Sequence, residues 1–183
     1  MIPEGKTDRL ILRPVELGDA AQIQRLFPHW EIVRYLQNVV PWPYPGDGAL
    51  TFLRDIALPA IARRKQWIWT LRLRENPDQV IGVLNLRQGE QDNRGFWLGL
   101  EWQRKGLMSE ACAWANDFWF ETLGSRVLRV TKAAENLASR RISEKEGMRL
   151  VGIQEKDYVC GRLTSEVWEI TAEEWEAWKK RRD

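Results

Sequence analysis

One stretch decides the fold of this chain: Glu101-Trp102-Gln103-Arg104-Lys105-Gly106-Leu107-Met108-Ser109-Glu110-Ala111. It follows a strand-like run, residues 95–100, and opens a long helix whose apolar residues fall on one face. A tight turn at the start of a helix points free backbone N–H groups outward, and the helix dipole adds partial positive charge. Because Arg104 and Lys105 add two cations, the stretch predicts a phosphate or pyrophosphate site. The simpler alternative is an ordinary strand-to-helix turn with surface cations.

The helix after this turn has the clearest periodicity in the chain. Cys112 lies on its apolar face, so we interpret this cysteine as a packing residue rather than a nucleophile. Gly124 is predicted to end the helix. The apolar face comprises Met108, Ala111, Cys112, Ala115, Phe118 and Trp119.

Strands and helices interleave along the rest of the chain, which predicts an α/β sheet with flanking helices. Residues 171–174 form a capping box that opens a last helix, with Trp175 and Trp178 on one face. Three prolines make residues 39–45 a rigid loop. Further helices are predicted at 19–27, 48–64 and 136–146. Strands are predicted at 9–15, 67–73, 80–86, 95–100, 127–131, 150–153 and 166–170.

The composition of the chain bounds its class. Its 183 residues predict a single domain, residues 1–183, with a sizeable core. A net charge of +2 and the lack of a basic run with interleaved aromatics argue against a nucleic-acid partner. Two cysteines and one histidine provide neither a metal-ligand spacing nor a disulfide framework. The amino terminus has no apolar stretch, so we expect no signal peptide, no membrane span and a cytoplasmic location.

A second informative segment lies downstream: Asn136-Leu137-Ala138-Ser139-Arg140-Arg141, followed by Ser143-Glu144-Lys145-Glu146-Gly147-Met148. Taken by itself, this segment makes Asn136 a helix cap and Ser139 a solvated helix residue. Together with Gln103-x-x-Gly106-x-Met108, it resembles the paired motifs of the GCN5-related N-acetyltransferase (GNAT) superfamily. Met108 departs from the general pattern, which has Gly or Ala there. It is similar to the variant in the ribosomal-protein-alanine (RimJ/RimL-like) branch.

The resemblance covers nearly the whole chain. Residues 7–14, 30–36 and 80–86 are similar to the opening strand, the second short helix and the third strand of the family. Lys156-Asp157-Tyr158 resembles the ribosomal-protein-alanine branch. The resemblance implies one mixed, twisted, mostly antiparallel sheet flanked by helices. Two central strands splay apart in a V, and the cofactor lies in the gap.

The resemblance also implies the reaction. Acetyl-coenzyme A is the expected co-substrate, a primary amine attacks its thioester directly in a ternary complex, and no metal is required. The turn would hold the pyrophosphate by backbone N–H groups, and residues on the preceding strand would offer backbone groups to the pantetheine arm. The implied cofactor residues are Leu98, Leu100, Gln103, Arg104, Lys105, Gly106, Leu107, Met108, Ser109, Asn136, Ser139 and Arg140.

The implied catalytic groups are Ser139 and Tyr158. Ser139 matches the family position that bonds the leaving sulfur, and Tyr158 is the alternative proton donor or, equally, an aromatic packed near the cleft. The general base is open. Asn93 stands where relatives often carry Glu, and the adjacent Asp92 is expected to face the opposite way. Other carboxylates are Glu101 and Asp157, and proton removal through ordered water is an equal alternative.

Trp30, Trp42 and Tyr44 lie where relatives form the acceptor site. The leading function is acetylation of a protein amino terminus. The alternatives are acetylation of a small-molecule amine and a non-catalytic acyl-coenzyme A binding module. The sequence leaves open whether the protein is a monomer or a homodimer.

Overall fold

The strands form two antiparallel sheets in the computed structural model, which describes residues 2–181. The larger sheet has the order β1-β2-β3-β4-β5, and the smaller has the order β6-β8-β7. The larger sheet consists of β1 (Gly5–Lys6), β2 (Leu10–Pro14), β3 (Gln66–Leu73), β4 (Gly82–Arg87) and β5 (Arg94–Leu98). The smaller sheet consists of β6 (Val127–Ala133), β7 (Arg149–Tyr158) and β8 (Gly161–Thr171).

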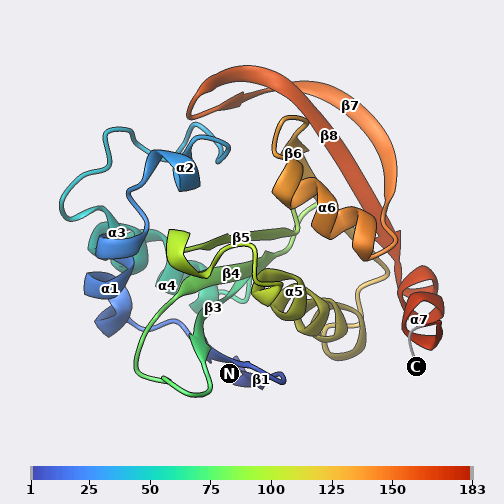
Figure 1. Cartoon of the computed structure of the whole chain (residues 1–183), viewed down its shortest axis with the longest axis horizontal. Helices are drawn as coiled ribbons and strands as arrows, with labels where there is room; N and C mark the ends of the chain where they lie inside the picture. Colours follow the sequence, from blue (N-terminus) through green and yellow to red (C-terminus); the bar gives the residue numbers. More distant parts are fainter. Residues whose placement is uncertain (1, 182–183) are drawn as a thin grey trace.

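Helices cover both faces of the larger sheet (Figure 1). One face carries a run of short helices: η1 (Leu17–Asp19), α1 (Ala20–Leu26), α2 (Trp30–Val33), α3 (Gly48–Phe52), the π-helical turn η2 (Leu53–Ala57) and α4 (Leu58–Ala62). The other face carries α5 (Leu107–Asp117), which follows the 3-10 turn η3 (Leu100–Trp102) and continues into the π-helical turn η4 (Phe118–Thr122). The smaller sheet is flanked by α6 (Leu137–Lys145), and α7 (Ala172–Lys180) follows β8.

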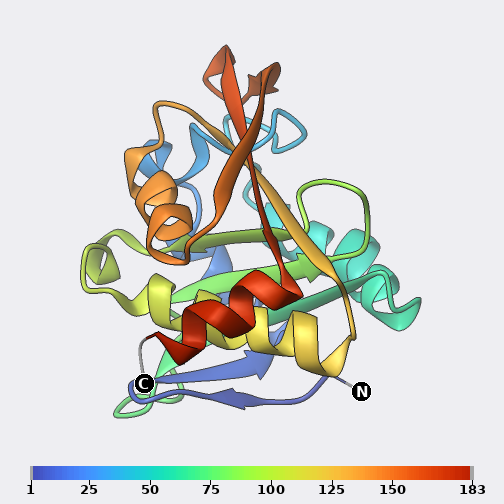
Figure 2. The same cartoon turned by 90° about the vertical axis from the view of Figure 1, so that its right-hand side faces the viewer.

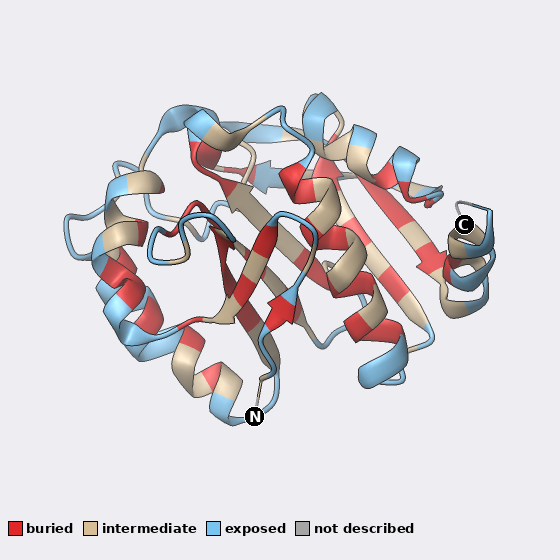
Figure 3. Ribbon diagram, turned by 60° about the horizontal axis from the view of Figure 1, so that its bottom comes forward, coloured by how far each residue is buried: buried red, intermediate tan, exposed pale blue. Residues whose placement is uncertain are grey.

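Alternation along the strands divides the apolar residues into two cores. In β3, Trp69 and Leu71 pack toward α5, whereas Ile68, which directly precedes Trp69, packs toward α1 and α3. Cys112 is fully buried in the first core, and burial raises the pKa of its thiol to about 12. Figure 3 shows the buried residues on the strand faces and on the helix sides turned toward them. The packing interpretation of Cys112 is therefore confirmed.

The two sheets join at one point and diverge beyond it. The backbone N–H of Asn93, just before β5, donates to the carbonyl of Arg129 in β6 at 2.7 Å. The Arg129 N–H donates in turn to the Asn93 side-chain oxygen at 2.8 Å. Beyond this contact the hydrogen-bonded ladder is broken, and the smaller sheet stands away from the larger one (Figure 2). The predicted antiparallel sheet structure with flanking helices and a V-shaped splay between its central strands is confirmed, but the strands form two antiparallel sheets and not one mixed sheet, because the backbone ladder stops at the join.

A buried ion pair lies beside this join. The Arg94 guanidinium donates to both carboxylate oxygens of Glu146, at 3.0 and 2.8 Å, and to the Asn116 side-chain oxygen at 2.5 Å. The Arg94 side chain is 0% exposed and that of Glu146 is 4% exposed. This contact ties β5 to α5 and to the end of α6, so it fixes the two helices that border the gap.

Three local predictions need correction. The strands predicted at 150–153 and 166–170 are longer in the structure, where they form β7 and β8. Polar residues continue the pairing of these two strands beyond the apolar segments on which the prediction was based. Leu100 was predicted on a strand but begins the turn η3. The helix predicted at 48–64 is interrupted by the π-helical turn η2.

Two other local predictions are confirmed. Gly124 adopts φ +65 after η4, and the capping box of α7 forms between Thr171 and Glu174. Trp175 and Trp178 stack, with ring centroids 4.5 Å apart.

The buried ion pair gives a stability prediction. Glu146→Ala leaves the Arg94 guanidinium buried without its carboxylate, which costs about 3–5 kcal/mol of unfolding free energy. Urea unfolding followed by tryptophan fluorescence measures this loss. Glu144→Ala is the matched control, because Glu144 lies on the same helix but is half-exposed and sits 3.6 Å from Arg140. We expect the control to lose less than about 0.5 kcal/mol. Equal losses in the two variants would contradict this role of Arg94.

Candidate active site

The turn before α5 has the geometry of an anion site. Gly106 is the N-cap residue and adopts φ +76, a left-handed conformation that favours glycine. The Glu110 N–H donates to the Gly106 carbonyl at 3.1 Å, which closes the first turn of the helix. The amides of Leu107, Met108 and Ser109 precede it in that turn, where amides have no intrahelical acceptor. The turn therefore presents free donors at the positive end of the helix dipole.

Contacts from the first strands hold this turn in place. Arg9 donates to the Lys105 carbonyl at 2.9 Å and to the Glu110 carboxylate at 2.7 Å. Thr7 donates a further hydrogen bond to Glu110. Burial raises the pKa of Glu110, but the bonds from Thr7 and Arg9 outweigh burial and hold it below its usual range. The carboxylate thus stays ionised and keeps Arg9 fixed beside the turn.

The side chains of the turn divide into two groups. Those of Leu107 and Met108 are buried in the core, whereas those of Arg104 and Lys105 are exposed. Arg104 adopts φ +62, so the backbone reverses direction there. Because Met108 points into the core, a large residue at this position leaves the amide donors of the turn free. Its departure from the general motif is compatible with an anion site.

The strand before the turn presents fewer free groups than the sequence suggested. The Leu98 carbonyl, which is expected to meet the pantetheine arm, accepts a hydrogen bond from the Gln103 side chain at 3.0 Å. Leu100 lies in η3, with an exposed side chain, and not on β5. One acceptor site of the Leu98 carbonyl is therefore occupied by Gln103, and its second lone pair is left for a ligand.

The second motif forms the start of α6. The Asn136 side chain accepts the Ser139 N–H at 3.3 Å, so Asn136 is the N-cap, the alternative that the sequence left open. The Ser139 carbonyl accepts from Lys132 Nζ at 2.9 Å. Arg140 lies 3.4 Å from Glu166 and 3.6 Å from Glu144. Its charge is therefore directed toward two carboxylates in this structure.

Tyr158 lies at the end of β7, which pairs with β8 on the side away from β6. Its hydroxyl is buried and donates to Ser165 Oγ at 2.7 Å, and Ser165 donates to the Lys132 carbonyl at 3.3 Å. Burial is the main reason that the pKa of Tyr158 is raised, and the nearby Asp92 charge adds to it. Within residues 2–181, no hydrogen bond joins Tyr158 to Ser139. The two candidate proton donors therefore do not form a pair.

Asp92 is the residue that sequence reasoning misplaced. It adopts φ +55, and this left-handed turn directs its carboxylate across the gap instead of to the far face of β5. The carboxylate accepts from the Thr131 N–H at 3.0 Å, Lys156 Nζ at 2.5 Å and the Gln37 side chain at 3.1 Å. The sequence feature that indicates this left-handed turn is the Asp-Asn pair at 92–93, because Asp tolerates this conformation.

The other two carboxylates considered as the base, Glu101 and Asp157, are solvated. Glu101 is exposed in η3, and the exposed Asp157 pairs with Arg162 at 3.2 Å. Asn93, which stands where relatives carry Glu, donates its amide to the Arg87 and Gly89 carbonyls and accepts from Arg129. Its role is thus to join the sheets. None of these groups has the environment of a strong base.

The segment after α2 closes one side of the gap against the β7–β8 turn. The Val159 N–H donates to the Leu36 carbonyl at 2.9 Å, and the Asn38 N–H donates to the Asp157 carbonyl at 3.3 Å. Gln37 forms an isolated bridge with Tyr158. The α2 segment therefore lies beside the predicted catalytic tyrosine.

The three aromatics predicted for the acceptor site take two positions. Trp42 pairs with Trp30, with ring centroids 5.6 Å apart, and both rings are 41% exposed. Tyr44 instead packs edge-on against Phe27, at 5.0 Å between centroids. The structure thus leaves a tryptophan pair on the surface and directs Tyr44 toward the core.

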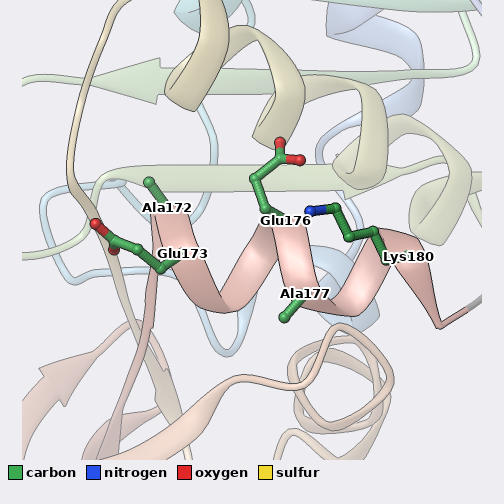
Figure 4. A pocket seen from close by; sticks show the side chains of 5 residues that line it. All are labelled: Ala172, Glu173, Glu176, Ala177 and Lys180. Atoms are coloured by element: carbon green, nitrogen blue, oxygen red, sulfur yellow. The ribbon is translucent and has the colours of Figure 1, made fainter.

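A shallow depression lies on the surface of α7 (Figure 4). It contains none of the residues predicted to bind cofactor or acceptor, and all its lining residues belong to one helix. They are Ala172, Glu173, Glu176, Ala177 and Lys180.

Comparison with known proteins identifies the family. A family model described as an acetyltransferase (GNAT) domain matches residues 9–149. YoaA of Bacillus subtilis, described as an uncharacterized N-acetyltransferase, is 29% identical over 161 residues, which cover 84% of this chain and 86% of YoaA. The chain therefore belongs to the acetyltransferase (GNAT) domain family, and its class is that of acetyltransferase enzymes.

Solved structures share the fold. The ribosomal-protein-S5-alanine acetyltransferase of Vibrio fischeri aligns with a TM-score of 0.79 at 13% identity, covering 94% of this chain and 98% of that one. RimJ of Mycobacterium smegmatis, in complex with CoA-disulfide, aligns with a TM-score of 0.77 at 21% identity, covering 93% and 88%. The RimJ/RimL-like resemblance of the sequence motifs is thereby confirmed at the level of the fold.

Within residues 2–181, no group of His, Cys, Asp and Glu side chains has the arrangement of a metal site. No helix in this part of the chain is long and apolar enough to cross a bilayer.

The Asp92 contacts predict a measurable effect on stability. Asp92→Ala removes charge-assisted bonds to Lys156, Thr131 and Gln37, which join the two sheets and the α2 segment. We expect a loss of about 2 kcal/mol of unfolding free energy in urea. Asp157→Ala, which removes an exposed carboxylate near the β7–β8 turn, is the control and should change stability by less than about 0.5 kcal/mol. If Asp92→Ala unfolds at the same urea concentration as the wild-type protein, these contacts do not hold the sheets together.

Proposed function

We propose that this protein transfers the acetyl group of acetyl-coenzyme A to the α-amine of a protein amino terminus. The observation that carries the proposal is the left-handed glycine turn at Gly106, braced by Arg9 and Glu110 at the start of α5. Membership in the GNAT family supports the reaction class. The RimJ structure in complex with CoA-disulfide supports coenzyme A as the carrier.

The cofactor would lie along the gap between β5 and β6. The amides of the turn at 104–109 bind the pyrophosphate, and exposed Arg104 and Lys105 add positive charge. Backbone groups at Leu98 meet the pantetheine arm, for which the carbonyl offers the lone pair that Gln103 does not use. Asn136, Ser139 and Arg140 line the opposite wall, at the start of α6. When bound, the cofactor supplies an activated acetyl thioester.

The reaction then needs no covalent enzyme intermediate. The ammonium of the acceptor first loses one proton to water or a base. The neutral amine nitrogen then forms a bond to the acetyl carbon, the carbon–sulfur bond breaks, and the sulfur leaves as a thiolate. The nitrogen gives up its second proton to become the amide, and the thiolate takes up a proton. Ser139 is the proposed donor to the sulfur, and Tyr158 is the alternative, which would first have to leave Ser165.

The site favours acceptors that lose their proton readily. Asp92 accepts hydrogen bonds from three residues, Asn93 cannot take up a proton usefully, and Glu101 and Asp157 are solvated. An amine that is already partly neutral therefore suits the site better than a lysine side chain. The exposed Trp30–Trp42 pair offers apolar area to the first residues of an extended peptide.

The proposed partner is accordingly a protein with a free amino terminus, in the cytoplasm. The shared fold with the ribosomal-protein-S5-alanine acetyltransferase of Vibrio fischeri supports a protein acceptor. A small-molecule amine is the competing acceptor.

The first test concerns the cofactor. Gly106→Glu places bulk and negative charge where the pyrophosphate is proposed to bind, so calorimetric binding of acetyl-coenzyme A should be lost. The far-ultraviolet spectrum should be unchanged. Gly124→Glu is the matched control, because Gly124 also has a positive φ, +65, and an added Cβ there meets nothing within 4 Å. The control introduces the same strain and charge away from the turn and should bind normally. Parent-like affinity of Gly106→Glu would overturn the assignment of the turn.

The second test concerns the acceptor. An α-amine has a pKa near 7.8, so roughly a third is neutral at pH 7.5. A lysine amine, with a pKa near 10.4, is neutral about once in a thousand molecules, and its deprotonation costs about 4 kcal/mol. We expect thioester turnover to be much faster with an Ala- or Ser-initiated peptide than with the same peptide blocked at its α-amine and bearing a free lysine.

The comparison needs two further substrates. A doubly blocked peptide sets the background of thioester hydrolysis, and a polyamine represents the small-molecule alternative. Rapid acetylation of the α-blocked peptide would refute the α-amine preference. Turnover of the polyamine alone would assign the protein to small amines.

A further inference from the structure

A buried lysine lies behind the start of α6. Lys132, in β6, is 5% exposed, and none of the carboxylates in residues 2–181 forms an ion pair with it. Its Nζ donates to the Ser139 carbonyl at 2.9 Å and to Ser143 Oγ at 2.5 Å. These acceptors lie one turn apart on α6, so this lysine ties β6 to the middle of that helix.

This contact fixes the residue that we place at the leaving sulfur. The Ser139 N–H is held by Asn136, and its carbonyl is held by Lys132. Both backbone groups of Ser139 are therefore anchored, which sets the position from which its hydroxyl extends. The direction of the first turn of α6 depends in part on the Lys132 side chain.

Charged and titratable groups from the neighbouring strands and helices surround Lys132 and affect its pKa. Burial lowers the pKa of Lys132 to about 7, and the positive charge of Arg94 lowers it as well. The carboxylates act in the opposite direction, but Glu146 is paired with Arg94, and Glu166 accepts from Trp168 and lies 3.4 Å from Arg140. The surrounding groups are Arg94 of β5, Cys112 of α5, Glu146 after α6 and Glu166 of β8.

The local geometry suits both forms of the side chain. An ammonium donates to the Ser139 carbonyl and to Ser143 Oγ. A neutral amine still donates to the carbonyl and accepts a hydrogen bond from the Ser143 hydroxyl. Lys132 can therefore gain or lose its charge while the contacts to α6 are kept.

We propose that Lys132 is a positioning residue for acetyl transfer, and that it takes up a proton when the anionic cofactor binds beside the start of α6. This inference rests on the proposed use of acetyl-coenzyme A. A negative charge nearby favours the ammonium and raises the pKa of a lysine. The pyrophosphate of the bound cofactor, and later the leaving thiolate, supply that charge.

The sign of the pH dependence follows. The pKa of Lys132 in the free protein is about 7. Below that pH the ammonium is already present, so Lys132 takes up almost no proton when the cofactor binds. Above that value, binding must recruit a proton, so the contribution of Lys132 to affinity falls as pH rises through the pKa of the complex.

Calorimetry tests the proposal directly. Acetyl-coenzyme A is titrated at pH 7.5 in buffers of different ionisation enthalpy, and the slope of binding enthalpy against ionisation enthalpy gives the protons taken up. The parent should take up about half a proton more than Lys132→Met. The phosphate groups of the cofactor titrate alike in both proteins, so the difference isolates Lys132.

Two further variants separate charge from packing. Lys132→Arg keeps a permanent cation, so it should retain cofactor affinity within a few-fold while losing the extra proton uptake. Lys145→Met removes an exposed lysine at the far end of α6 and should take up protons as the parent does. Lys132→Met should bind about tenfold more weakly than the parent at pH 6.5, and this ratio should shrink at pH 8.5.

The outcomes are distinct. Equal proton uptake by the parent and Lys132→Met overturns this inference while the proposed function stands. If Lys132→Met does not fold, equal uptake by the parent and Lys132→Arg overturns it in the same way. A parent protein that does not bind acetyl-coenzyme A overturns the proposed function and this inference with it.

Discussion

The structure depends on how β5 and β6 are held together at one end and apart at the other. A continuous backbone ladder would close the sheet, but here side chains replace it after a single contact at Asn93. The Asn93 amide bonds Arg129, and the Asp92 carboxylate bonds Thr131 and Lys156 across the gap. Because buried polar groups are costly unless each finds its partner, this set of contacts fixes the separation of the two sheets.

The same region of contacts also positions the helices beside the gap. Arg94 follows Asn93 directly and pairs with Glu146, which closes α6, while Asn116 of α5 bonds the same guanidinium. Each of these helices begins after a strand that borders the gap, α5 after β5 and α6 after β6. Their amino termini therefore meet the gap where the strands diverge, and the positive ends of two helix dipoles lie near one opening.

Much of the local structure could be predicted from the sequence. The Gly106 turn, the helix after it, the capping box of α7 and the burial of Cys112 all follow from short-range spacing. The incorrect predictions have physical causes. Leu100 appeared to continue a strand because it is apolar, yet the chain turns at η3. The long β7 was underestimated because it is an edge strand exposed to solvent, so its residues carry no apolar alternation.

The sequence by itself determined the family, the glycine turn at the start of α5 and the packed face of that helix, because the residues of each motif lie close together along the chain. Only the tertiary structure decided what Asp92, Asn93 and Lys132 do. Asp92 meets Thr131 and Lys156 from 39 and 64 positions away, and its left-handed backbone reverses the face that strand alternation implies. The role of such a polar side chain is set by partners that folding brings to it, and no local pattern encodes them.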